Sequence, residues 1–471
     1  MMHAKLLQIT DRLRQSYWFI PSMMTFAAVL LAGGMIWLDS YEGSGWMDRF
    51  AWLYASRPSG ARQVLSAIGG SMITVAGTVF SVTIAAVVYA SGQYGPRLLS
   101  NFMSDRGNQV TLGTFIATFI YCLIVLRTVR SAEESGGAGF VPNMALLVGV
   151  FLAVCSIAVL IFFIHHVPSK IHINSVIEDI GHRLLKEIDH RFPNSIGEGP
   201  AEDDDPAGRD LVPATFREHA SAKDGAQRGL IEAKRTGYIQ VVGDEAILEV
   251  ATKHDLVLRL QYQPGDFAHT GRALVEVWPP ARCDEDVARA IRSAFSFGAR
   301  RSALQDLRFL IDELVEIAAR ALSPGVNDPF TAITCLDWLS AALSALSQRR
   351  LPSHLRLDDE GALRVIAHPV TFEGFIDRSF GALAQYCSTD MVAALRYVRA
   401  LGEVSLDCED PERLATLGRY LDRLEALAEE GLKGFNLCRV RERAGTLRKA
   451  LAEPDYQRRL RDGTAWLGGT A

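Results

Sequence analysis

The sequence predicts a membrane-embedded region of four α-helices followed by a cytoplasmic α+β region, which contains a small β module and a helical bundle. Hydrophobic residues make up 49% of the 471 residues, and nearly all of their excess lies before residue 166. After that point apolar and charged residues alternate, at strand spacing between residues 230 and 280 and at helix spacing in most other segments. This uneven distribution indicates one membrane region and one soluble region in a chain that is too long for a single ordinary domain.

Four apolar stretches are each long enough to cross a bilayer, which needs about 20 residues of helix for a hydrocarbon core of roughly 30 Å. The first has Trp18 and Trp37 at its ends, where aromatic side chains match the two water interfaces. Lysine and arginine are modestly enriched on the side of the N-terminus. We therefore expect residues 1–166 to form a transmembrane domain, with both chain termini in the cytoplasm. The four spans are residues 17–38, 66–90, 110–126 and 144–164.

Hydroxyl side chains follow one face of the second span. Steps of three, four and three residues place them on one side of a helix, where they are expected to face protein or water because lipid offers them no partner. One interpretation is close packing between helices. The other is an aqueous path for small ions or solutes that several copies of the chain line with these residues. The hydroxyl residues are Ser71, Thr74, Thr78 and Ser81 in this span, and Thr111, Thr114, Thr118 and Tyr121 in the next.

Two segments separate the membrane region from the β module. Residues 167–192 place apolar side chains, such as Ile177 and Leu184, at helix spacing with charges between them. This pattern predicts an amphipathic connecting helix whose apolar face needs a partner. Residues 193–229 are polar and include the acidic run 202–205, which is typical of a solvated loop and lacks the spaced ligands of a calcium-binding loop.

Residues 230–280 have strand character and form the predicted β module. Turn signals at residues 264–267 and at Gly271 separate the strands. The order of strands and turns resembles a barrel-sandwich hybrid, the fold of biotinyl and lipoyl domains and of adaptor proteins in export systems. Lys253 lacks the flanking motif of a carrier lysine, so we expect a structural or docking module without a cofactor. The predicted strands are residues 237–242, 246–251, 255–262 and 273–278.

Residues 281–471 predict a cytoplasmic helical domain. Gly325 can end one helix, and Asp328 can cap the next, which has Pro329 at its first position. Residues 363–366 are consistent with one further strand. The predicted helices are residues 284–296, 304–322, 329–347, 372–386, 391–401, 411–430 and 435–451.

Five short motifs are distributed over the chain, at residues 18–21, 70–77, 102–107, 305–306 and 321–331. Together they resemble a bacterial family of predicted inner-membrane proteins known as domain of unknown function 2254. The resemblance covers essentially the whole chain, and the last motif is the most distinctive. It implies a membrane protein with a cytoplasmic C-terminal region, and it implies no reaction because the name of the family records none.

The sequence contains no Gly-rich phosphate loop with its lysine, no H-E-x-x-H motif and no G-x-S-x-G elbow, so we do not expect an enzyme. One set of polar residues could converge on a ligand if the helices that begin near residues 304 and 329 pack as a hairpin. Ordinary ion pairs and helix capping would account for the same residues. This possible cytoplasmic ligand cluster is Arg301, Gln305, Asp306 and Asn327.

The remaining signals bear on partners and metals. A formal net charge of −5 gives no basic excess for binding nucleic acid. The seven cysteines form no C-x-x-C pair, and His165 and His166 have no carboxylate or thiol at ligand spacing, so no metal site is predicted. The expected partners are the lipid bilayer and further copies of the chain. We expect a pore or channel-like homo-oligomer with a cytoplasmic vestibule or gate, and the alternative is a non-conducting scaffold or sensor that recruits cytoplasmic partners.

Overall fold

The computed structural model describes residues 16–41, 57–95, 105–131, 140–192, 212–213, 216, 228–368 and 370–462. The chain divides into two compact units. We call Thr10–Ser175 the N-terminal unit and Val176–Ala471 the C-terminal unit. The predicted polar loop at 193–229, with its acidic run, lies almost entirely outside the described residues.

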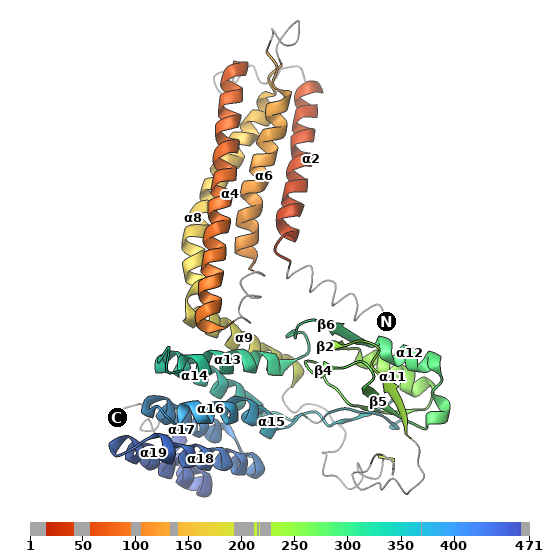
Figure 1. The fold of residues 1–471 in the computed structure, drawn as a ribbon, viewed down its shortest axis with the longest axis vertical. Coiled ribbons are helices and arrows are strands. Elements are labelled where there is room, and N and C mark those ends of the chain that lie inside the picture. The colour runs from red at the N-terminus through yellow and green to blue at the C-terminus, as the bar shows by residue number, and fades with distance from the viewer. Residues whose placement is uncertain are drawn as a thin grey trace. The chain divides into compact units, whose positions relative to one another are not determined.

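Four long helices form the described part of the N-terminal unit (Figure 1). Helix α6 packs against each of the other three. Asp105 caps α6, because its carboxylate accepts a hydrogen bond from the Asn108 backbone N–H at 3.2 Å. Pro58 begins α4, at a position where the missing N–H of proline leaves no helical hydrogen bond unmade. The helices are α2 (Phe19–Tyr41), α4 (Pro58–Tyr94), α6 (Arg106–Thr128) and α8 (Asn143–Ile171).

The interior of this bundle contains polar groups that bond to one another. The hydroxyls of Thr118 in α6 and Ser156 in α8 lie 3.1 Å apart, and the Tyr121 hydroxyl donates to the Ala145 carbonyl at 2.9 Å. Thr118, Tyr121 and Thr111 are all buried. Thr118 and Tyr121 therefore join α6 to α8 within one chain, whereas Thr111 and Thr114 bond to carbonyls of α6 itself.

By length and composition, five described helices could cross a membrane. Four are the helices of the N-terminal unit, and the fifth is α14 (Pro329–Ser347). Helix α14 packs against α13 (Leu307–Ala321) and α17 (Met391–Asp407) within the C-terminal unit, where Leu336 and Leu339 are buried. An apolar helix of this kind is also typical of the core of a large soluble domain.

The strands of the C-terminal unit form two open sheets, a five-stranded sheet of order β1-β5-β3-β8-β7 and a three-stranded sheet of order β4-β2-β6. Strands β3 and β8 are parallel, and the other neighbours are antiparallel. Among the described residues neither sheet closes into a barrel, so the structure does not confirm a barrel-sandwich hybrid. The strands are β1 (Gly229–Glu232), β2 (Gly237–Val242), β3 (Val257–Leu260), β4 (Phe267–Ala268), β5 (Ala273–Trp278), β6 (Phe295–Gly298), β7 (Leu355–Leu357) and β8 (Leu363–Ile366).

The prediction of a strand at residues 246–251 is wrong. The segment belongs to helix α11 (Asp244–Lys253), which buries Ile247 and Ala251, one turn apart, against the five-stranded sheet and α12. Asp244 and Glu245 in the first turn favour a helix, because negative charge is stabilising near the positive end of the helix dipole.

Helices α13 to α20 pack as a layered bundle beside the sheets, whereas α12 packs on α11 and β6 (Figure 1). Helix α9, predicted as an amphipathic connector, turns Ile177, Ile180, Leu184 and Ile188 into the interior. Trp338 of α14 lies directly on Gly181 of α9, which leaves no room for a Cβ atom there. The helices not yet given are α9 (Ile173–Arg191), η4 (Pro280–Arg282), α12 (Glu285–Ser293), α15 (Phe372–Ile376), η5 (Asp377–Gly381), α16 (Ala382–Cys387), α18 (Pro411–Gly431), α19 (Phe435–Ala452) and α20 (Pro454–Asp462).

Candidate functional site

The hydroxyl residues of the second span all lie on the exposed side of α4, opposite the face that packs on α6 and α8. Each hydroxyl donates to a backbone carbonyl of its own helix, four residues earlier. Thr74 bonds the Gly70 carbonyl at 2.9 Å, and Thr78 bonds the Thr74 carbonyl at 3.1 Å. Ser71 and Ser81 make the same contact, at 2.6 and 2.8 Å. We call Ser71, Thr74, Thr78 and Ser81 the hydroxyl stripe.

The exposed faces of α4 and α8 differ in character. The exposed face of α8 is bulky and apolar, with side chains such as Phe151, Ile157 and Ile161. On α4 the stripe is interspersed with Gly70 and Gly77, where a Cβ atom would meet no other atom within 4 Å, and the exposed side of this helix also carries large apolar side chains such as Val82 and Val88. A bulky apolar face suits lipid chains, whereas small and hydroxyl residues suit a second helix or water.

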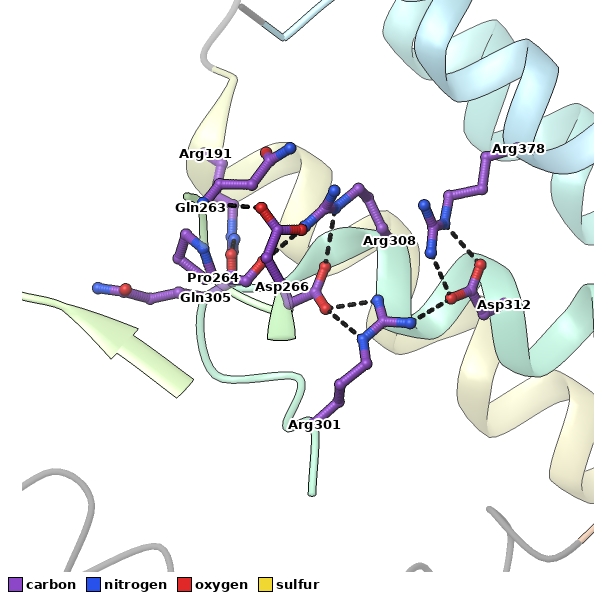
Figure 2. Close-up of polar contacts among 10 residues, drawn as sticks. Arg191, Gln263, Pro264, Asp266, Arg301, Gln305, Arg308, Asp312 and Arg378 are labelled. Carbon is purple, nitrogen blue, oxygen red and sulfur yellow. Dashed lines mark hydrogen bonds and ion pairs between the residues drawn. The ribbon is translucent and has the colours of Figure 1, made fainter. Parts of the chain in front are cut away.

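The predicted ligand cluster lies in the C-terminal unit, where the loop before α13 meets the turn before β4 (Figure 2). The Asp306 side chain is buried, with 2% of the residue exposed. Arg301 donates to one of its carboxylate oxygens from Nε at 2.9 Å, and Arg308 lies 3.3 Å from the other. Arg308 also donates to the Pro264 carbonyl at 2.7 Å and to Asp266 at 3.0 Å. The cluster therefore joins the β module to α13.

Gln305 acts beside this cluster and contacts different partners. Its side-chain amide forms a pair of hydrogen bonds with the backbone of Val242 in β2, at 2.8 and 3.1 Å. The carbonyls of Gln305 and Leu304 accept hydrogen bonds from Arg191 at the end of α9. One short segment thus connects the three-stranded sheet, α9 and the start of α13.

Asn327 does not join the cluster. It lies after the C-terminal end of α13 and is exposed, whereas Arg301, Gln305 and Asp306 precede the first residue of that helix. The 15 residues of α13 span about 22 Å at 1.5 Å per residue. Asn327 has a φ of +51°, in the left-handed region that asparagine tolerates, and its role is to shape the turn before Asp328 caps α14.

Sequence reasoning missed four members of the site, Asp266, Arg308, Asp312 and Arg378. Arg301 and Arg378 both point toward Asp312 (Figure 2), and Arg378 donates to its two oxygens at 2.6 and 2.7 Å. Asp312 lies in the second turn of α13, four residues after Arg308 and on the same side of the helix, and this spacing alone is a weak signal for an ion pair. Arg378 is 66 residues distant in sequence, and no local pattern points to it. We call Arg301, Asp306, Arg308, Asp266, Asp312 and Arg378 the ion-pair cluster.

The charge on Asp312 gives a pH-dependent prediction. Burial alone would raise the pKa of Asp312, but the hydrogen bonds from Arg378 and Arg301 outweigh it and hold the pKa below its ordinary value. A lowered pKa stabilises the fold above the unfolded-state value of about 3.9, and this stability is lost as pH falls through the lower folded-state value. Asp312→Asn should therefore lower the free energy of unfolding at neutral pH by roughly 1–3 kcal/mol.

Denaturant unfolding of the full chain in detergent, followed from about pH 7 to about pH 3, tests this expectation. The difference between wild type and Asp312→Asn should shrink below about pH 4. Asp286→Asn is the control, because the Asp286–Arg289 pair is largely exposed. A difference for Asp312→Asn that stays constant with pH would contradict the assignment.

Every carboxylate of the ion-pair cluster is bonded to a guanidinium group, so the arrangement holds secondary-structure elements together. Among the described residues no group of three or more His, Cys, Asp or Glu side chains is placed to hold a metal ion. His166 does have a carboxylate partner, contrary to the expectation from sequence spacing. Its Nε2 lies 2.9 Å from the carboxylate of Asp105, which caps α6 and lies 61 residues earlier in the sequence.

Comparisons with known proteins agree with this architecture. A family model described as predicted membrane protein, DUF2254, matches residues 14–403. The uncharacterized proteins Mb1321c of Mycobacterium bovis and Rv1290c of Mycobacterium tuberculosis are each 31% identical to the chain over 411 residues, which cover 86% of this chain and 74% of theirs. No solved structure matches the chain. The chain therefore belongs to the DUF2254 family of predicted membrane proteins.

Proposed function

We propose that this protein crosses the bacterial inner membrane four times, with both termini in the cytoplasm, and assembles from several identical copies into a pore or channel-like path. In this proposal the hydroxyl stripe of α4 lines the path, and the C-terminal unit forms a cytoplasmic vestibule or gate. The count of four crossings is favoured because α14, the fifth apolar helix, is packed against α13 and α17.

The observation that carries the proposal is the polar, small-residue character of an exposed membrane-helix face. Hydroxyl groups and glycines gather on one side of α4, among apolar residues such as Val82 and Val88, whereas the exposed residues of α8 are mostly bulky and apolar. The open space beside Gly70 and Gly77 allows the helix of another copy to approach closely. The stripe holds no charge, which suits passage of a solute better than tight binding of an ion.

The connection between the two units supports a gating role. Only His172 separates α8 from α9. Arg349, two residues after the end of α14, donates to the Ile188 carbonyl of α9 at 3.2 Å. Arg191, the last residue of α9, donates to the Leu304 carbonyl at 2.9 Å. A rearrangement of the C-terminal unit would therefore move α9 and, through it, the end of a membrane helix.

Conductance of the purified protein in planar bilayers tests the proposal. Thr78→Trp should abolish the current, because the indole would fill the path. Ile157→Trp is the matched control, since Ile157 lies on the bulky apolar face of α8, and its conductance should equal that of the wild type. A wild-type protein without current, or a Thr78→Trp variant with unchanged current, would contradict the pore.

One observation favours a second candidate, a non-conducting scaffold or sensor. The hydroxyls of the stripe already bond to carbonyls of their own helix, so the stripe can lie in a dry helix–helix contact. Absence of current, together with a stoichiometric cytoplasmic partner recovered from native membranes, would favour this function over the pore.

A further inference from the structure

The loop between α13 and α14 exposes large apolar side chains. Phe330 is 71% exposed and Val326 is 46% exposed, and Pro324 is exposed beside them. We call Pro324, Val326 and Phe330 the apolar tip. Exposed apolar groups that gather on one surface commonly mark a contact with a membrane or with another protein.

The backbone holds the tip in this exposed position. The Asn327 N–H donates to the Ser323 carbonyl at 2.9 Å, and the Asp328 N–H donates to the Ala321 carbonyl at 2.7 Å. The Asp328 carboxylate then accepts from the Thr331 hydroxyl at 2.6 Å at the start of α14. A loop fixed by such bonds presents its apolar side chains without paying further ordering entropy when it binds.

Contacts between α9 and α14 place the tip at one end of the C-terminal unit. The Trp338 ring lies against Gly181 and 4.7 Å from the His182 ring, and Arg349 binds the carbonyls of Ile188 and Phe192. These contacts join the middle of α9 to the middle of α14 and the end of α9 to the end of α14, so the two helices run in the same direction. Phe330 lies eight residues before Trp338 on α14, and residue 173 lies eight residues before Gly181 on α9. Because both helices rise equally per residue, Phe330 is level with about residue 173.

Residue 173 begins α9, and α8 ends at residue 171. We infer that the apolar tip inserts into the bilayer interface on the side where α8 leaves the membrane. The tip lies near the first turn of α9, which follows α8 after one residue, and Phe330 supplies the aromatic group that membrane interfaces favour. The occupant is thus a lipid surface. This inference does not depend on whether the protein conducts.

A spin label on the tip tests the inference in the full chain, reconstituted into phosphatidylethanolamine–phosphatidylglycerol bilayers. The label is attached at Val326→Cys after Cys155, Cys283 and Cys438, the cysteines that are not buried, are replaced by alanine. Gln348→Cys is the control, because Gln348 is exposed at the other end of α14. Collision rates with oxygen, which enriches in lipid, and with a nickel chelate, which stays in water, are then compared.

The label at Val326→Cys should have an oxygen-to-nickel ratio several-fold higher than the label at Gln348→Cys. Adding Phe330→Glu should lower that ratio toward the value at Gln348→Cys without changing the melting temperature, because Phe330 is largely exposed. Equal ratios at the two sites would overturn the inference. A label shielded from both oxygen and nickel would also overturn it, since that result indicates a protein contact.

Discussion

Asp306→Ala is expected to lower the free energy of unfolding by about 3–5 kcal/mol, because it removes one partner of a buried ion pair and leaves the other charged. The Asp306 carboxylate binds Arg301 and Arg308, and both guanidinium groups are largely shielded from water. Arg301 would keep its contact with Asp312, but its bond to Asp306 at 2.9 Å would be lost. Denaturant unfolding of the full chain in detergent, followed by tryptophan fluorescence, measures the change.

Arg441→Ala provides the control for this experiment. Arg441 pairs with Glu429, and about half of each side chain is exposed. Exposed pairs contribute about 0–1 kcal/mol, so this variant should unfold close to the wild type. Similar losses for both variants would show that the ion-pair cluster contributes no more to stability than an ordinary surface pair.

Gly265→Ala is expected to have the second large effect. Gly265 has a φ of +94°, and a Cβ atom there would collide with the Asp306 carboxylate. Gly271→Ala is a matched control, because Gly271 has a φ of +81° and open space around the added carbon. The control should lose about 1–2 kcal/mol from the left-handed backbone alone, and Gly265→Ala should lose about 1–3 kcal/mol more from the collision.

The double variant separates the collision from other causes. If the methyl group of Gly265→Ala strikes the Asp306 carboxylate, adding Asp306→Ala removes the collision. The double variant should then lose less unfolding free energy than the sum of the losses of the two single variants. Gly271→Ala combined with Asp306→Ala should be additive. Additive losses for the Gly265 pair would contradict the packing of this turn against Asp306.

Periodicity predicted much of the helical architecture, because an apolar stripe with a period of 3.6 residues reports burial directly. It failed at residues 246–251, where the short run AILEVA fits a strand as well as a helix. There the acidic first turn and the burial of Ile247 and Ala251 favour the helix α11 over a strand. No local sequence pattern predicts strand β7 or the open form of the five-stranded sheet. Both depend on β8, which pairs with β7 and also with β3, about a hundred residues earlier in the sequence.

The candidate cluster was predictable only where its members are neighbours in sequence. Arg301 and Asp306 are five residues apart and do meet. Asn327 was grouped with them on the expectation of a helical hairpin. A hairpin places the start of its first helix beside the end of its second helix, so residues before α13 lie beside the end of α14 and far from the connecting loop. Asp266 and Arg378 come from other elements, and only the tertiary fold identifies them.

A single residue, His172, separates α8 from α9. His172 contributes only two soft backbone torsions. A connection of one residue passes a rotation from one helix to the next more directly than a long flexible linker does. In the proposed arrangement, a force that turns α9 about its axis reaches α8 through one residue, and a pull on α8 by a stretched or thinned bilayer reaches α9 by the same route.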